Sequence, residues 1–253
     1  MPPLAAKCFF RSGAPGERTP DTGADAYPTR AVRTGMPTRI GSPRRRFLGA
    51  VAASVAVGSA GCLGSAGGGG ASTPTAVSDP LDPPRRGAAD APVTVSVYVD
   101  FACPACRRFH EEFVPVLDRE YVDEGVAVYE HRDLPLEVHA PEAFRAASAA
   151  RAVQAGEGDP AFFAFASGLF DNQSDLSLDL YADLAEGVGA DPDAVRAAAR
   201  NRIYEATVER DRERGIAAGA EGTPTVAVDG TLVADLRWET VADRIEQARR
   251  ADE

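Results

Sequence analysis

Apolar and polar positions alternate in recognisable patterns only from about residue 91 onward. Residues 93–99 (VTVSVYV) alternate β-branched and polar side chains, which predicts a strand. A helix is expected after the CPAC sequence that follows, because four apolar side chains recur there at helical spacing: Phe109, Phe113, Val116 and Leu117. The pattern therefore places CPAC at the turn from a strand into a helix.

The centre of this region predicts a second strand and then a series of helices. The strand is expected at 126–131 and an alanine-rich helix at 141–155. Apolar side chains continue beyond it at helical spacing: Phe162, Phe165, Leu169, Phe170, Tyr181, Leu184 and Val188. Asp191 and Pro192 then supply a cap and a first-turn proline for a further helix. We interpret the aromatic stripe as core and not as a cofactor site.

The C-terminal part predicts a hairpin and a closing helix. Residues 226–228 and 232–233 flank Asp229-Gly230, a dipeptide typical of two-residue turns between antiparallel strands. A last helix, expected at 239–249, would cover the sheet. Together these elements predict one α/β domain over residues 91–251.

The first ninety residues have a different composition. Residues 1–35 show no strand or helix periodicity, and we predict that translation begins at Met36. The alternative is that 1–35 is a native disordered extension. Residues 63–90 are rich in Gly, Ser, Thr and Pro, which predicts a flexible linker.

Residues 36–62 have the order of an export signal. Three arginines (44–46) precede an apolar run that is too short to predict a membrane span. The sequence RRRFLG resembles a twin-arginine signal, and SAGC resembles a lipobox, which implies lipidation of Cys62. The alternatives are an uncleaved anchor or a chance arginine run before small residues.

The charge of the chain excludes one class of partner. Its formal net charge is −11, and this argues against nucleic acid, because phosphate binding needs a basic surface. Lys7 is the only lysine, so the cations of the predicted domain are all arginines. A lysine-free, acid-rich domain resembles proteins of halophilic microbes. An ordinary solvated acidic surface is the alternative.

The cysteines point to redox chemistry. Of the four, Cys8 and Cys62 precede the predicted domain, which leaves Cys103 and Cys106 as a CxxC pair. A disulfide between them would close almost no loop and so would add little stability, which favours a reactive role. Cys103 is expected at a helix N-terminus, with Pro104 in the first turn, where backbone amides stabilise a thiolate. Cys106 would be the more buried, resolving thiol.

A CxxC pair can also serve purposes besides disulfide exchange. Covalent haem attachment is excluded, because Arg107 stands where a histidine would be needed. A zinc site would need two more ligands, and the chain has three histidines: His110, His131 and His139. His110 could complete a copper(I) site with both thiolates. The pair could instead form an inert structural disulfide, or be vestigial in a binding module. We expect no metal and no cofactor.

Three segments resemble the DsbA-like branch of the thioredoxin-like thiol–disulfide oxidoreductases. They are DFACPAC after the first strand, RDLPLEVHAPEAFRAASAA after the second, which leads into the helical insertion, and GTPT before the hairpin. The resemblance covers about residues 92–249. It implies an α/β thioredoxin-like fold with a central mixed β-sheet and an inserted α-helical subdomain at about 139–217. It also implies a redox-active Cys103–Cys106 disulfide, with Thr223 and a cis Pro224 beside it to bind substrate.

The resemblance implies the function but leaves the direction of electron flow open. Pro104 and Ala105 would tune the thiolate, although the histidine that makes the best-known member strongly oxidising is absent. We expect disulfide exchange with unfolded or newly exported proteins by a lipid-anchored monomer on the extracytoplasmic face of the membrane, served by a membrane redox partner. A reductase for cytochrome maturation is the alternative. Asp100 would end the strand or cap the helix; the alternative is that it shuttles protons.

Overall fold

This computed structural model describes residues 75–252. It contains a mixed sheet, as predicted, with five strands and β2 at its centre. Strand β2 pairs in parallel with β3 and antiparallel with β4. In order across the sheet the strands are β1 (Arg85–Arg86), β3 (Ala127–Asp133), β2 (Val93–Val99), β4 (Thr225–Val228) and β5 (Thr231–Leu232). The bounds of β2 match the alternating run in the sequence.

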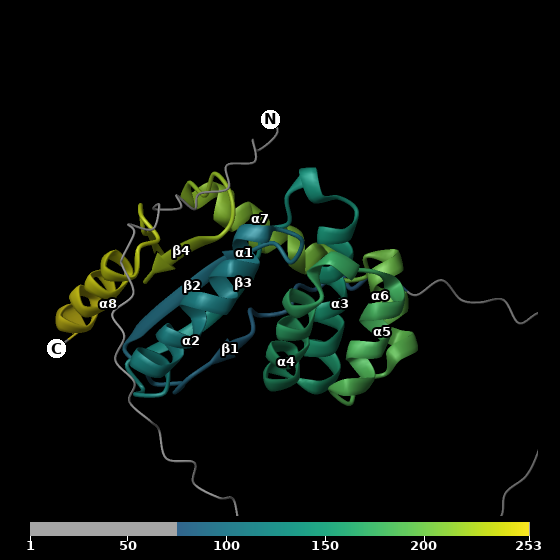
Figure 1. Cartoon of the computed structure of the whole chain (residues 1–253), viewed down its shortest axis with the longest axis horizontal. Coiled ribbons are helices and arrows are strands. Elements are labelled where there is room, and N and C mark those ends of the chain that lie inside the picture. The colour runs from purple at the N-terminus through teal and green to yellow at the C-terminus, as the bar shows by residue number, and fades with distance from the viewer. Residues whose placement is uncertain (1–74, 253) are drawn as a thin grey trace, which may run out of the picture. The chain divides into compact units, whose positions relative to one another are not determined.

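Helices cover both faces of the sheet (Figure 1). Between β2 and β3 lie α1 (Pro104–Arg108), the π-helical turns η1 (Phe109–Phe113) and η2 (Asp118–Val122), and α2 (Val114–Leu117). Between β3 and β4 lie η3 (Glu137–His139), α3 (Glu142–Glu157), α4 (Asp159–Asp171), η4 (Gln173–Asp175), α5 (Leu178–Gly187), α6 (Pro192–Asn201) and α7 (Glu205–Ala218); α8 (Trp238–Asp252) closes the domain. The predicted helical insertion is therefore confirmed.

The helix after CPAC is less regular than its apolar spacing predicted. Its α-helical turns alternate with wider π turns, η1 and η2. Pro115, in α2, has no amide hydrogen and cannot donate to the carbonyl of Glu111, one turn earlier. The regular ladder of hydrogen bonds is therefore interrupted, and the π turns lie on either side of α2.

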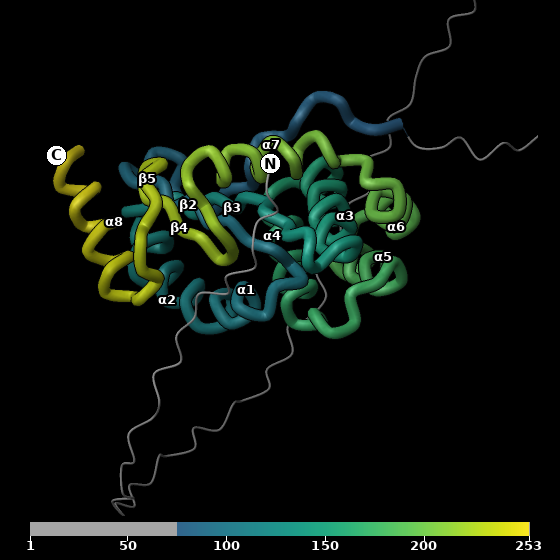
Figure 2. The backbone as a smooth tube through the Cα atoms, turned by 90° about the horizontal axis from the view of Figure 1, so that it is seen from above, coloured from purple at the N-terminus to yellow at the C-terminus, as the bar shows by residue number. Residues whose placement is uncertain are grey.

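The two faces of the sheet have separate cores because side chains of β2 alternate in direction. Val95 and Val97 belong to the larger core beneath α1, α2 and α8, whereas Tyr98 belongs to a smaller one beneath α7. Figure 2 shows α7 on the opposite side of the sheet from α1. Gly215 of α7 allows this approach, because a Cβ atom there would lie 3.0 Å from the Tyr98 ring.

The folded region begins before the predicted boundary at residue 91. Arg85 and Arg86 form β1 and pair with β3, although the sequence placed them in the flexible linker 63–90. Arg85 donates through Nε to Glu130 at 2.8 Å, and the guanidinium of Arg86 lies 4.1 Å from the Tyr129 ring centre. Composition predicted flexibility, but these side-chain contacts fix the segment to the sheet.

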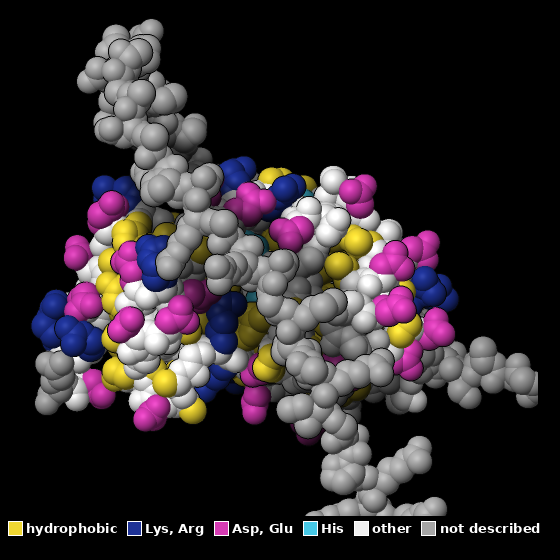
Figure 3. All heavy atoms as spheres, turned by 60° about the horizontal axis from the view of Figure 1, so that its bottom comes forward, with side chains coloured by type: hydrophobic (Ala, Val, Ile, Leu, Met, Phe, Trp, Pro, Cys, Tyr) yellow, Lys and Arg dark blue, Asp and Glu magenta, His cyan; other side chains and the backbone are white. Residues whose placement is uncertain are grey.

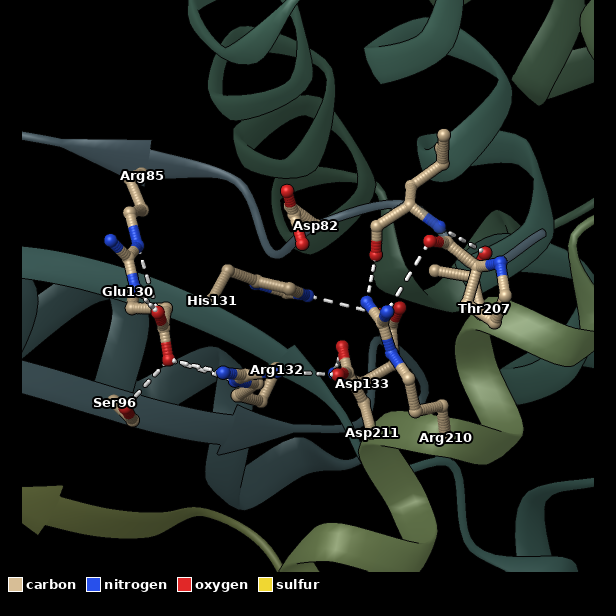
Figure 4. Close-up of polar contacts among 12 residues, drawn as sticks. Asp82, Arg85, Ser96, Glu130, His131, Arg132, Asp133, Thr207, Arg210 and Asp211 are labelled. Carbon is tan, nitrogen blue, oxygen red and sulfur yellow. Dashed lines mark hydrogen bonds and ion pairs between the residues drawn. The ribbon is translucent and has the colours of Figure 1, made fainter. Parts of the chain in front are cut away.

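A network of buried charges connects β3 to the helical insertion. Figure 4 shows Glu130, Arg132 and Asp211 joined in series between the sheet and α7. Arg151 of α3, whose side chain is fully buried, donates to Asp133 and to Asp211 at 2.6 Å each. Burial would raise the pKa of Asp133, but Arg151 and the hydrogen-bonded His131 lower it to about 2. The negative charges of Asp133 and Asp211 are therefore compensated by the arginines beside them, Arg151 for both and Arg132 for Asp211.

Several predictions fall outside the described residues. These are the extension 1–35, the export signal 36–62 with Cys62, and the linker before residue 75. Among residues 75–252, no helix has the length and apolar character needed to cross a bilayer. On the face in Figure 3, acidic side chains are spread over the surface with arginines between them.

Candidate functional site

The end of β2 and the start of α1 build the CPAC turn. Cys103 has extended backbone angles and precedes Pro104, the first residue of α1. The carbonyl of Cys103 accepts hydrogen bonds from the amides of Cys106 and Arg107 at 3.0 and 3.2 Å. The helix thus begins directly at the first cysteine, as the sequence predicted, and the backbone amides of Ala105 and Cys106 act on that sulfur.

Thr223 and Pro224 lie beside this turn although they are far away in sequence. The Thr223–Pro224 bond is cis, as the resemblance implied. The Sγ of Cys103 lies 3.6 Å from the carbonyl oxygen of Thr223, to which it can donate only while it is protonated. The neighbouring strands β2 and β4 bring these segments together, since Tyr98 is paired with Thr225.

The environment of Cys103 favours its thiolate. A hydrogen bond from the Cys106 thiol lowers the pKa of Cys103 to about 5, against the opposing effect of burial. Thr223 and the amides of Cys106 and Ala105 lower it further. A cysteine with this pKa is almost fully ionised at neutral pH and is therefore a nucleophile and a good leaving group.

The pKa of Cys106 is shifted in the opposite direction to that of Cys103. Burial raises the pKa of the Cys106 thiol well above the usual value, and the hydrogen bond to Cys103 raises it further. Its Sγ accepts a hydrogen bond from the amide of Asp100 at 3.4 Å. Both cysteines are free, and their opposite pKa shifts favour an ionised Cys103 beside a protonated Cys106.

The sequence predicted that Cys106 would be the more buried of the two cysteines, but both are buried in this structure. Cys103 is 0% exposed, as is Cys106, while Pro104 between them is exposed. The reason is that Sγ of Cys103 is turned toward the Thr223 carbonyl instead of toward solvent. Attack on this sulfur therefore requires the side chain or the Thr223–Pro224 segment to move.

Two polar side chains at the site were not predicted as functional, and both come from the chain beyond β3. The ring Nδ1 of His139 lies 2.6 Å from Oδ2 of Asp100. The side-chain amide of Gln173 donates to the carbonyls of Phe101 and Cys103 at 2.7 and 3.0 Å. No local pattern marks either residue, because each acts across more than 35 positions of sequence.

An apolar groove runs along the same side of the molecule. It has a volume of about 990 Å³ and lies between α1, the loop before β4 and the segment after β5. Phe113, Pro224 and Trp238 contribute to its lining, and the rings of Phe113 and Trp238 meet edge to face at 5.1 Å. The groove therefore begins beside the cis proline and extends away from the cysteines.

Comparison with known proteins identifies the family. A family model described as thioredoxin matches residues 81–247. The chain belongs to the thioredoxin family. Disulfide bond formation protein D of Bacillus subtilis is 25% identical over 171 residues, which cover 65% of this chain and 76% of that protein. The crystal structure of oxidised BdbD from Bacillus subtilis has a TM-score of 0.62 at 24% identity and covers 70% of this chain and 100% of that chain.

These similarities confirm the thioredoxin-like fold and the DsbA-like resemblance, and with them the predicted enzyme class, dithiol–disulfide exchange. The Na(+)/H(+) antiporter NhaA 3 of Salinispora tropica is also 35% identical over 155 residues. The match covers 60% of this chain but 22% of that protein, so it concerns one part of a longer chain.

The thioredoxin domain does not gather the ligands of the copper site that was considered from sequence. Within residues 75–252 there is no cluster of three or more His, Cys, Asp or Glu side chains able to hold a metal. His110 contacts Ser167 through Nε2 at 3.3 Å and stacks on Phe170 at 4.8 Å. His131 is buried and contacts Asp133.

Gln173 is expected to hold the redox turn of the thioredoxin domain in place. Gln173→Glu keeps the size of the side chain but replaces the amide donor with a carboxylate beside two carbonyl oxygens. We expect a loss of about 1–3 kcal/mol in the free energy of unfolding in urea, because the Phe101 carbonyl loses its side-chain donor and a carboxylate is placed beside two carbonyl oxygens. A further effect is a higher pKa of Cys103, measured by thiolate absorbance, since a negative charge opposes its ionisation.

The matched control for Gln173→Glu is Ser174→Asp at the next position. Ser174 is exposed and its hydroxyl donates to the exposed carboxylate of Asp175. Ser174→Asp therefore adds the same charge as Gln173→Glu without removing a contact to the turn. Equal effects of the two variants on unfolding and on the pKa of Cys103 would contradict a specific role for Gln173.

Proposed function

We propose that this protein oxidises thiols of newly exported proteins through the Cys103–Cys106 pair. The observation that carries the proposal is the stabilised thiolate of Cys103 at the start of α1, next to Thr223. Stabilising the thiolate stabilises the reduced form of the pair, and a couple with a stable reduced form is a strong oxidant. The pKa of Cys103 therefore favours disulfide donation over reduction.

The exchange would proceed in two steps. A substrate thiolate attacks Sγ of Cys103 in the oxidised enzyme; the Cys103–Cys106 bond breaks, and Cys106 leaves and takes a proton. A second substrate thiolate then attacks the substrate sulfur of the mixed disulfide, and Cys103 leaves as a thiolate. The substrate loses two electrons and forms a disulfide, while the enzyme pair gains them.

The groove beside Pro224 is suited to an extended substrate segment. Its apolar walls would contact side chains around the reacting cysteine, and the backbone of Thr223 would align the segment with Cys103. Unfolded or newly exported proteins expose such segments, whereas folded proteins bury them. Pro104 and Ala105, which are uncharged, would leave the pKa of Cys103 to the amides and to the surrounding side chains.

The cellular setting belongs to the same proposal. The twin-arginine and lipobox resemblances support an enzyme that is exported and tethered through Cys62 to the extracytoplasmic side of the membrane. A membrane redox partner would reoxidise the pair, because each turnover leaves two electrons on the enzyme. We propose that the protein works as a monomer without cofactor or metal.

The reduction equilibrium of the pair tests this function. The full chain carrying Cys8→Ser and Cys62→Ser, so that the pair supplies the only thiols, is equilibrated with glutathione buffers and the reduced fraction is measured. We expect a potential of about −120 to −180 mV, typical of disulfide donors. A value of about −230 to −270 mV would instead support the alternative reductase, and the absence of a reversible couple would overturn both.

A further inference from the structure

Asp100 connects the redox turn to the segment after β3. Its carboxylate is buried and accepts hydrogen bonds from the amide of Ala102 at 2.7 Å and from that of Leu136 at 3.0 Å. The same carboxylate contacts Nδ1 of His139 at 2.6 Å, and the amide of Asp100 donates to Cys106. One residue thus contacts the resolving cysteine and fixes the position of an imidazole.

His139 is held in place at one nitrogen only. It is the last residue of η3, and its side chain is 20% exposed. Nε2 has no hydrogen-bond partner among the residues that the structure describes. A ring anchored at Nδ1 by a buried carboxylate and still reached by solvent can gain and lose a proton without leaving its position.

The charges around His139 come from two groups. Asp100 raises the pKa of His139 through its hydrogen bond, and the negative charge of Cys103 raises it further. The other charged side chains nearby are paired elsewhere: Glu137 of η3 with Arg212 of α7, and Glu142 of α3 with Arg145. Asp100, next to the redox turn, is therefore the charged side chain that contacts the His139 ring directly.

We propose that His139, oriented by Asp100, is a positioning residue that stabilises the Cys103 thiolate and binds the proton that reduction of the pair sets free. The proposal deepens the proposed function and depends on it. CPAC itself has no charged side chain between its cysteines, and Arg107, directly after them, pairs with Glu111 at 2.7 Å. A histidine 36 residues away in sequence from Cys103 supplies the positive charge.

The proton balance gives this proposal a measurable form. When two glutathione thiols reduce the disulfide, one of their protons goes to Cys106 and the other is left over, because Cys103 stays ionised. If the second proton goes to solvent, the equilibrium constant rises about tenfold per pH unit. Over the pH range in which His139 takes up this proton, the constant stays level instead.

The experiment compares the full chain with its His139→Gln variant, both carrying Cys8→Ser and Cys62→Ser. Glutamine can still donate to Asp100 but has no charge. At pH 6 we expect the variant's equilibrium constant for reduction by glutathione to be about fivefold or more below that of the parent. At a pH well above the pKa of His139 in the reduced protein, where the ring is neutral, the two constants should agree. His110→Gln, which removes the imidazole stacked on Phe170, is the matched control and should match the parent at both values.

A second measurement needs no substitution at the site. Linkage is reciprocal, so the pKa of His139, followed by NMR, should be higher in the reduced than in the oxidised protein by the logarithm of that fold-change. The chain has three histidines, so the signal is readily assigned. Equal constants at pH 6 together with one pKa of His139 in both redox states would overturn this proposal while leaving the proposed function intact. Loss of any reversible couple in the parent would instead overturn the proposed function.

Discussion

Replacing Cys103 with serine is expected to reduce disulfide exchange with a reduced, unfolded protein by about three orders of magnitude or more. A serine hydroxyl at this position forms no mixed disulfide, and Cys106 cannot substitute for it, because its thiol is fully buried and burial raises its pKa. The measurement is the rate at which the oxidised full chain forms disulfides in the substrate.

Cys106→Ser removes the enzyme's own disulfide, so this variant should also fail to oxidise a reduced substrate. Given an oxidised substrate instead, its Cys103 thiolate can attack the substrate disulfide and release one substrate thiolate. No Cys106 thiol is present to attack the resulting mixed disulfide, which should accumulate on a non-reducing gel. Cys8→Ser, the same change outside the described domain, should leave the rate unchanged. A Cys103→Ser protein that retains the parent rate would show that another group performs the chemistry.

The second large effect concerns stability. Arg151→Met, of similar length, should lower the free energy of unfolding by about 3–5 kcal/mol, measured by urea denaturation. The arginine side chain is fully buried and neutralises Asp133 and Asp211, which are themselves buried. Its removal leaves carboxylates in the interior with too little positive charge beside them.

Arg145→Met is the control on the same helix. Arg145 is partly exposed and pairs with Glu142, so its loss should cost less than about 1 kcal/mol. Adding Asp211→Asn to Arg151→Met should recover part of the lost stability, because it removes one uncompensated charge. Equal costs for the two arginine substitutions would contradict the proposed importance of the buried network.

Local sequence patterns predicted the elements that carry the cysteines. The alternation at 93–99 gave β2 its observed bounds. Asp229-Gly230 marked the turn between β4 and β5, where both residues have positive φ values of 47° and 75°. CPAC was placed correctly at the start of a helix. Each of these features depends on neighbouring residues, so a single sequence contains the information needed.

The features that the sequence patterns did not predict depend on contacts between distant segments of the chain. β3 contains Glu130, His131, Arg132 and Asp133, all buried, although four consecutive polar residues suggest an exposed surface. Arg151 has the same ambiguity, since an arginine within an alanine-rich helix usually faces solvent. The sequence offered one signal, the position of Arg151 four residues after Ala147 and directly after Ala150, alanines that turn out to be buried. His139 and Gln173 gave no comparable signal.

The site combines two segments that lie far apart in sequence, the CPAC turn and the segment around Thr223. This distance along the chain determines when the site is completed during synthesis. Cys103 and Thr223 are 120 positions apart, so a ribosome releases the whole helical insertion before it releases the second side. A nascent chain that ends before Thr223 presents CPAC without the Thr223 side chain, which lowers the pKa of Cys103. The pair thus acquires its full acidity only after the last hairpin has been released. A protein exported in the folded state, as the predicted signal implies, would cross the membrane with this site already assembled.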